Sequence, residues 1–429
     1  MSWSPGTHSL IHILTHSLTY SLSHSLRGDT NYGGDSTSIS SMSKNLTFVT
    51  GSKFGYLSYN NYSSDIVEWG DYYACSDETK QLLRDDDIEI DSITANERSF
   101  AILRKDGSVL TCGEDICGGN ASASSSTYNT YLSGNVKSIT ATSCAFAALY
   151  EDGSIYSWGD SNVGGSGVIV YGSFVDIYAT RGAFSALAKD GSVYSWGHSL
   201  YGGDQHNYAA DLAQDIAYVV STSRVFIAMK KDRTLICWGD YTVGAGQDIE
   251  AFRLKTNYIG GSSVGVATVF NTGVVASWGD YENNMGISSL YSNITDADRI
   301  FGNNRAFAVL MTDGTVSTFG HDASGGDSSD VQSDLTGVEW VYRTHRAFAA
   351  LKSDGTVVTW GAAAWGGDSS SVQSSLTNVI KICSNEAAFF AIRSTTDASG
   401  SNVVAWGNSY FGGDASSVQS SLIGVSDCI

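Results

Sequence analysis

A Trp-Gly pair that recurs along the chain constrains its fold more than any other feature. The pair begins at Trp69, Trp158, Trp196, Trp238, Trp278, Trp360 and Trp406, with degenerate copies at Arg27-Gly28, Cys112-Gly113 and Phe319-Gly320. The 379 residues from Gly28 to Gly407 hold nine intervals of about 42 residues, a period typical of repeats that pack on one another. We therefore expect nine units that end near residues 70, 113, 159, 197, 239, 279, 320, 361 and 407, followed by a partial unit.

Each unit has the pattern of a β-hairpin. In the unit that ends at Gly361, apolar residues around Phe348 and Val357 flank Asp354-Gly355, and such a pair favours a tight turn because both residues tolerate positive φ. A period-two apolar alternation such as residues 379–382 predicts a further strand before the hairpin. The Gly/Ser loop after Trp-Gly has room for a fourth strand or a helical turn. Sustained 3.6-residue periodicity is absent, so we expect few helices.

One position of the repeat holds an apolar ring of residues. Its members are Phe54, Phe100, Phe146, Phe184, Phe226, Phe307, Phe348 and Phe389, with Val266 in the remaining unit. Small sheets cannot bury both faces alone, so neighbouring units must pack face to face on this position. The sequence thus predicts an all-β protein made of three- to four-stranded units, either a β-propeller if the array closes or an open superhelical array if it does not.

The first 27 residues differ from the rest. Residues 8–26 approximate a four-residue repeat of His-Ser-Leu-Thr, which predicts a disordered, low-complexity tail, and the repeat array then covers residues 28–429. The last five residues, 425–429, match only half of a predicted strand. We expect either a segment of a longer array or a ring closed without a shared blade.

Charge and hydropathy argue against nucleic-acid and membrane partners. The chain carries 24 Lys and Arg against 44 Asp and Glu, a net charge of −20, and its basic residues form no cluster that could neutralise a polyanion. The sequence has no apolar run of the roughly 18 residues that a membrane span requires. We expect a protein partner instead.

The seven cysteines are scattered, with no C-x-x-C pair. They are Cys75, Cys112, Cys117, Cys144, Cys237, Cys383 and Cys428. This pattern predicts neither a disulfide framework nor a zinc site, and it favours a cytoplasmic, reduced protein. Secretion is the alternative, because Asn45, Asn61, Asn120 and Asn293 begin glycosylation sequons.

Catalytic and metal sites are not indicated. Nucleophile, base and orienting acid do not recur in any unit, so we expect no enzyme and no cofactor. His198 and His321 follow the Trp-Gly or Phe-Gly pair, where other units hold Asp, and a polar cap on a turn is the plain explanation. The acids of Asp322 to Asp327 lack the alternating spacing of calcium loops, so we expect no metal there.

Two repeated positions are candidate partner-binding sites. Aromatic residues precede the paired glycines at Tyr32, Tyr201, Trp365 and Phe411. We expect them to pack between units, with an arc of exposed partner anchors as the alternative. Arginines stand two residues before the core phenylalanine at Arg98, Arg224, Arg305 and Arg346. We expect ion pairs or hydrogen bonds to a neighbouring unit, with a partner-binding stripe as the alternative.

The repeat resembles a known family. Residues 346–361 read as Phe-Ala-Ala-Leu-Lys-x-Asp-Gly-x-Val-x-x-Trp-Gly after Arg-Ala, and this grammar is similar to the regulator of chromosome condensation (RCC1-like) repeats, above all to the short-period branch that includes a β-lactamase-inhibiting propeller. The resemblance covers residues 28–429. It implies a seven-bladed β-propeller, against nine units by count, that binds other proteins through loops on one face.

The resemblance and the absence of a catalytic motif together favour a non-catalytic protein-interaction module. Guanine-nucleotide exchange on a small GTPase is an alternative that the family also implies. A secreted glycan-binding or surface-structural repeat protein is the second alternative.

Overall fold

A computed structural model describes most of the repeat array. The described residues are 48–51, 55–60, 65–70, 75, 77–83, 89–119, 132, 134–243, 256–262, 265–279, 289–291, 294–397 and 400–415. The predicted tail at residues 1–27, the final residues 425–429, Tyr32, Phe54 and all four sequon asparagines lie outside them.

The described residues form nine antiparallel sheets, seven of three strands and two of four. In chain order the strands are β1 (Phe48–Gly51), β2 (Gly55–Asn60) and β3 (Asp65–Gly70); β4 (Ile90–Ala95), β5 (Ser99–Arg104) and β6 (Val109–Gly113); β7 (Val136–Ala141), β8 (Ala145–Tyr150), β9 (Ile155–Gly159) and β10 (Ser166–Val170); β11 (Phe174–Ala179), β12 (Ala183–Ala188) and β13 (Val193–Gly197); β14 (Ile216–Ser221), β15 (Val225–Lys230) and β16 (Leu235–Gly239); β17 (Thr256–Gly261), β18 (Gly265–Phe270), β19 (Val275–Gly279) and β20 (Ser289–Tyr291); β21 (Ala297–Gly302), β22 (Ala306–Met311) and β23 (Val316–Gly320); β24 (Val338–Arg343), β25 (Ala347–Lys352) and β26 (Val357–Gly361); β27 (Val379–Ser384), β28 (Ala388–Arg393) and β29 (Val403–Gly407).

Helical segments are short. The described part has one α-helix, α1 (Asp77–Leu83), and the 3-10 helices η3 (Asp115–Cys117), η4 (Ser161–Val163), η5 (Ser199–Tyr201), η6 (His206–Tyr208), η7 (Tyr241–Val243), η10 (Asp322–Ser324), η11 (Ser329–Asp334), η12 (Ala363–Trp365), η13 (Gln373–Ser375) and η14 (Ser409–Phe411). Both a fourth strand and a helical turn therefore occur after the Trp-Gly pair, as the loop length allowed. None of these helices is long and apolar enough to cross a membrane.

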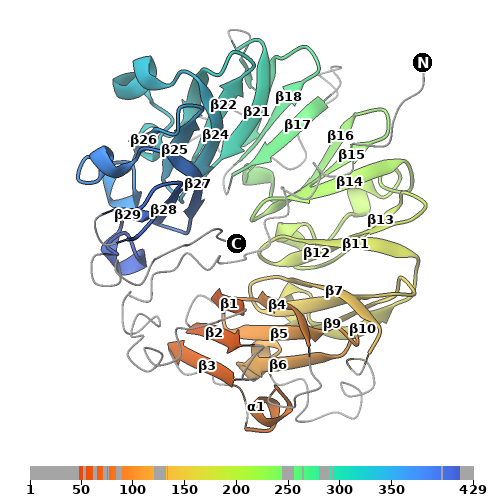
Figure 1. Ribbon diagram of the computed structural model, residues 1–429. Helices are drawn as coiled ribbons and strands as arrows, with labels where there is room; N and C mark the ends of the chain where they lie inside the picture. Colours follow the sequence, from red (N-terminus) through yellow and green to blue (C-terminus); the bar gives the residue numbers. More distant parts are fainter. Residues whose placement is uncertain are drawn as a thin grey trace, which may run out of the picture.

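The sheets pack face to face in chain order around a common centre, which is the arrangement of a β-propeller (Figure 1). Buried clusters join each sheet to the next, as where Val225 and Ile227 of β15 pack with Val266 of β18. The first strands of successive sheets contact one another, including β4 with β7, β11 with β14, and β21 with β24. We call each sheet a blade.

In five blades the core contains a stacked pair of the repeated phenylalanine and the Trp-Gly tryptophan. Phe348 on β25 lies opposite Trp360 on β26, and their rings stack with centroids 5.2 Å apart. Both side chains are buried between β24–β26 and the preceding blade. Phe389 and Trp406 repeat the arrangement in the last blade. The periodic aromatics are thus structural, and the predicted inter-blade core is confirmed.

The Asp-Gly turns form one end of the blades, here called the hairpin end. Asp354 accepts hydrogen bonds from the backbone N and the Oγ1 of Thr356, and Gly355 has a φ of +77°. The carbonyl of Gly355 accepts a 2.9 Å bond from the backbone N of Val379 in the next blade. The turn therefore closes its own hairpin and also attaches it to the neighbouring blade.

Candidate protein-binding face

The opposite end of the blades, here called the loop face, combines two kinds of turn. The first kind joins the first strand of a blade to the second, and the second kind is the 3-10 helix after the last strand. The first-kind turns lie at residues 96–98, 142–144, 180–182, 222–224, 303–305, 344–346 and 385–387, and the helices are η3, η4, η5, η7, η10, η12 and η14. All lie at one end because the strands alternate in direction.

A polar side chain caps four of the loop-face 3-10 helices, at Asp160, His198, Asp240 and Asn408. His321 makes no such bond to η10, so the polar cap expected there is wrong. The best example is η5. The His198 Nδ1 accepts a 3.2 Å bond from the backbone N of Leu200, and Gly202 ends the helix with a φ of +92°. The carbonyl of Gly202 accepts a bond from Trp238 Nε1 of the next blade. The predicted capping role of His198 is confirmed, and the structure shows a second role for the tryptophan, namely to hold the preceding loop.

A side chain of the first-kind turn fixes the same helix from the other side. Thr344 Oγ1 donates a 2.8 Å bond to the carbonyl of Trp365, and Thr180 and Asn385 make the corresponding bonds to Tyr201 and Phe411. The residue before the glycine is thereby held in place in these three blades.

The predicted aromatics are half-buried. Tyr201, Trp365 and Phe411 each pack against the core cluster of a blade, as the packing interpretation required, whereas Tyr32 lies outside the described residues. The His345 ring stacks on Trp365 with centroids 5.7 Å apart. These aromatic side chains therefore offer a partner only part of their surface.

Neighbouring residues that the sequence did not single out are much more exposed. The exposed fractions are 62% for Ile116, 60% for Leu200, 59% for Tyr241 and 67% for Tyr410. Ile116, Leu200 and Tyr410 are each the middle residue of a 3-10 helix and stand one position before Cys117, Tyr201 and Phe411. The sequence shows apolar residues both directly before the paired glycines and one position earlier. Which of these two positions is exposed depends on the direction of the 3-10 helix, which the sequence does not show.

The arginines occupy the first-kind turns. Arg98 Nη1 lies 3.0 Å from Glu114 Oε2, and Arg224 Nη1 lies 3.0 Å from Asp240 Oδ2. The predicted ion pairs are therefore present here, but the carboxylate follows the last strand of the arginine's own blade and does not come from a neighbouring blade. Arg224 also lies over the Tyr201 ring of the preceding loop at 6.0 Å.

The surroundings of Asp240 keep it charged in its ion pair with Arg224. Burial opposes the charged form of Asp240, but hydrogen bonds from Thr242 and Arg224 outweigh it and lower the pKa of this carboxyl. Asp240 is therefore ionised at neutral pH and neutralises Arg224.

Backbone hydrogen bonds connect the first-kind turns near the centre of the propeller. The backbone N of Glu97 donates to Ser143, Ser143 to Arg181, and Arg181 to Ser223. An ion pair of 3.0 Å joins Arg181 Nη2 to Glu97 Oε1 across the intervening blade. Together these bonds link the turns of four successive blades into a polar frame on the loop face.

The same frame continues on the other side of the propeller. The backbone N of Asn304 donates to the carbonyl of His345, and that of His345 to the carbonyl of Glu386. Burial lowers the pKa of His345, although the charge of Glu386 opposes this shift. His345 is thus neutral at physiological pH and acts as a packing partner of Trp365.

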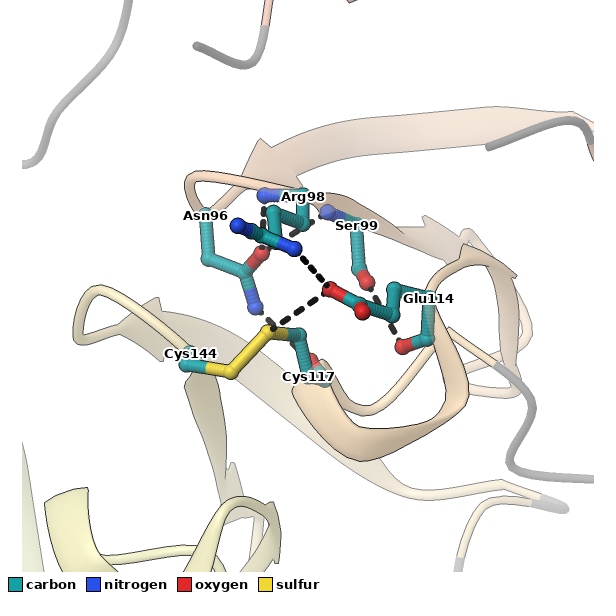
Figure 2. Close-up of polar contacts among 6 residues, drawn as sticks. All are labelled: Asn96, Arg98, Ser99, Glu114, Cys117 and Cys144. Atoms are coloured by element: carbon teal, nitrogen blue, oxygen red, sulfur yellow. Dashed lines mark hydrogen bonds and ion pairs between the residues drawn. A yellow bond between two sulfur atoms is a disulfide. The ribbon is translucent and has the colours of Figure 1, made fainter. Parts of the chain in front are cut away.

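Two disulfides cross between blades, which corrects the prediction that the scattered cysteines form no disulfide framework. Cys117 of η3 bonds Cys144 in the first-kind turn of the next blade (Figure 2). Asn96 holds the Cys117 carbonyl, and its Oδ1 accepts the backbone N–H groups of Arg98 and Ser99.

The second disulfide joins Cys75 to Cys112, and Cys383 is also disulfide-bonded. The pairs were missed because cysteines far apart in sequence meet only once neighbouring blades pack. An alignment of the repeats could have indicated the second disulfide. Cys112 stands at the position of the Trp-Gly tryptophan and Cys75 at that of the helix-ending glycine, and these two positions are in contact in other blades, as Trp158 and Gly118 show.

A cluster of metal ligands is not found in the described part of the chain. Groups of three or more His, Cys, Asp or Glu side chains placed to hold a metal do not occur there. Asp327 accepts the backbone N of Ser329, and this bond lowers the pKa of its carboxyl. Its role is therefore that of a turn former.

Comparison with known proteins gives likeness to solved structures alone. No family model and no curated protein matches the chain. Prp20p from Saccharomyces cerevisiae is 13% identical, with a TM-score of 0.33 over 55% of this chain and 72% of Prp20p. The receptor kinase CR4 ectodomain of Physcomitrella patens is 13% identical, with a TM-score of 0.37 over 62% of this chain and 70% of that one.

The receptor kinase ACR4 ectodomain of Arabidopsis thaliana is 11% identical, with a TM-score of 0.34 over 64% of this chain and 94% of the ectodomain. Likeness at this level does not say what the present chain binds. Membership of the regulator of chromosome condensation family stays a prediction from the repeats.

Proposed function

We propose that the protein is a non-catalytic propeller that binds a protein partner through its loop face. The observation that carries this proposal is the exposure of Ile116, Leu200, Tyr241 and Tyr410 on that face. Exposed apolar and aromatic side chains around polar groups are typical of interface anchors. The hydrogen-bonded frame beneath them favours binding, because anchors on a rigid support lose little conformational freedom.

Introducing charge at two of these side chains tests the proposal. The double variant Leu200→Glu/Tyr410→Glu places carboxylates at two anchors, and Tyr171→Glu is the matched control. Tyr171 is 81% exposed and follows β10 at the hairpin end. We expect wild type and Tyr171→Glu to capture the same protein equally well from the source cells. The double variant should fail to capture it. If captured proteins are the same for all three, the loop face is not the binding surface.

We further propose that the protein works in an oxidising compartment, as the secreted alternative has it. The disulfides Cys75–Cys112 and Cys117–Cys144 support this, because structural disulfides persist mainly outside the reducing cytoplasm. Rapid alkylation of the native protein in its source cells, followed by peptide mass spectrometry, tests it. Alkylated Cys117 and Cys144 would place the protein in a reducing compartment.

Nucleotide exchange on a small GTPase remains the alternative activity. Release of a fluorescent guanine nucleotide from a panel of small GTPases, with and without the protein, would detect it.

A further inference from the structure

The four arginines that stand two residues before a repeated phenylalanine differ in the residue that stands sixteen positions later. In every case the backbone N of that residue donates to the carbonyl of the arginine, so it occupies the same place in each blade. The pairs are Arg98 with Glu114 at 3.2 Å, Arg224 with Asp240 at 3.2 Å, Arg305 with His321 at 2.9 Å, and Arg346 with Ala362 at 2.9 Å. Two blades therefore supply a carboxylate at this place and two do not.

The side chains follow this difference. Glu114 and Asp240 each bind their arginine with one 3.0 Å contact to Nη1. Within the ranges that the structure describes, Arg305 and Arg346 form no ion pair. Arg346 is exposed and lies over the Trp365 ring at 5.4 Å, which leaves the edge of its guanidinium for other contacts.

The two arginines are neighbours on the loop face. Arg305 follows Asn304 and Arg346 follows His345, and the 3.1 Å backbone bond from Asn304 to His345 holds the two turns side by side. Burial keeps His345 uncharged, so the local positive charge comes from the arginines. Asp322 is exposed on η10, and Glu386, whose backbone carbonyl accepts from His345, is the acid whose charge acts on that histidine.

We propose that Arg305 and Arg346 bind the carboxylates of an acidic segment of the protein partner. This inference rests on the proposed function of the loop face and adds the chemistry of the partner. Arg98 and Arg224 show that the position engages a carboxylate at 3.0 Å, and the partner supplies the group that His321 and Ala362 lack. The net charge of −20 does not prevent this, because salt screens charges beyond about 8 Å at physiological ionic strength.

Fluorescence polarisation with a labelled decapeptide of glutamate, at physiological salt, tests the inference on the full chain. We expect wild type to bind this probe and Arg305→Gln/Arg346→Gln to bind it about tenfold more weakly, since two charge-assisted contacts are lost. The matched control Arg98→Gln/Arg224→Gln should bind as wild type does. Absence of binding to wild type, or equal weakening by both double variants, would overturn the inference.

A second variant separates loss of the site from loss of folding. His321→Glu/Ala362→Glu keeps both arginines and supplies the carboxylates that the other blades have. We expect the same weakening of about tenfold, because the internal carboxylates compete with the probe. Unchanged binding would show that the arginines are not the site. A phosphoserine decapeptide that binds more tightly than the glutamate peptide would overturn the choice of carboxylate.

The outcome is distinguishable from failure of the proposed function. If Leu200→Glu/Tyr410→Glu abolishes capture of the partner while the arginine variants leave both capture and peptide binding unchanged, the loop face stands and the acidic segment is rejected. If the arginine variants lose the peptide while no anchor variant affects capture, the anion site stands and the apolar anchors are rejected.

Discussion

The hairpin end and the loop face of the propeller are stabilised by different kinds of contact. At the hairpin end an aspartate accepts from a Ser or Thr two residues later in six blades, with Asp106, Asp152, Asp190, Asp232, Asp313 and Asp354 as the acceptors. On the loop face the contact between neighbouring blades is a cation over a ring in one place and a disulfide in another. The hairpin end thus repeats one side-chain contact from blade to blade, whereas the loop face keeps the same backbone and changes the side chains that meet on it.

The variation on the loop face follows fixed positions. Cys117 and Cys144 stand where Tyr201 and Arg224 stand two blades later, so the disulfide replaces the contact of the arginine with the ring. Cys75 and Cys112 likewise replace the glycine carbonyl and the tryptophan Nε1 that bond elsewhere, as in Gly118 and Trp158. A surface whose contacts change while its frame is kept is suited to carry a specific function.

Loss of the Cys117–Cys144 disulfide should have the largest effect. The bond closes a loop with a sequence separation of 27. Its removal in Cys117→Ser/Cys144→Ser should lower the free energy of unfolding by about 3.5 kcal/mol, because the unfolded chain regains loop entropy. Denaturant unfolding measures it. Arg224→Gln, which removes the non-covalent equivalent, should cost less than about 1 kcal/mol. Equal effects would show that the disulfide adds nothing to the contact it replaces.

The next largest effects on stability should come from replacing one glycine at each end, with the greater loss on the loop face. In Gly366→Ala on the loop face, φ is +91° and the new Cβ would lie 2.6 Å from the buried Phe389 ring, so we expect a loss of about 3 kcal/mol. In Gly355→Ala at the hairpin end, φ is +77° and the nearest atom is Cα of Asn378 at 3.1 Å, so we expect about 1–2 kcal/mol. Thermal unfolding ranks the two variants, and the reverse order would contradict this account.

The hairpin end should respond to acid. Hydrogen bonds from Thr356 hold the pKa of Asp354 below its ordinary value of 3.8. A lowered pKa in the folded state gives stability that is present above 3.8 and is lost as the pH falls through the folded pKa. Asp354→Asn keeps an acceptor without the charge, so its Tm should lie slightly below wild type at pH 7 and converge with it in acid. A difference in Tm that is constant with pH would exclude this role.

Local signals in the sequence were sufficient for the hairpins and for the core. Asp354-Gly355 and the spacing of Phe348 and Trp360 depend on residues close in the chain, and each occupies its expected strand or turn. The disulfides and the exposed position of Leu200 were missed, because they depend on contacts between blades and on the direction of a 3-10 helix. The ion pair of Arg98 was expected, but its partner was found in the same blade.

The smallest expected effects on stability come from arginine substitutions on the loop face, where Arg98 has an ion pair and Arg346 has none among the described residues. Arg98→Gln removes a half-exposed, screened ion pair with Glu114 and should lower the free energy of unfolding by about 0.5 kcal/mol. Arg346→Gln removes no ion pair in the part of the chain that the structure describes, and loses instead the contact over the Trp365 ring, which should cost a comparable amount. Raising the salt concentration should abolish the cost of Arg98→Gln and leave the cost of Arg346→Gln unchanged. If the cost of Arg346→Gln fell with salt in the same way, Arg346 would have an internal ion pair, and its availability to a partner carboxylate would be ruled out.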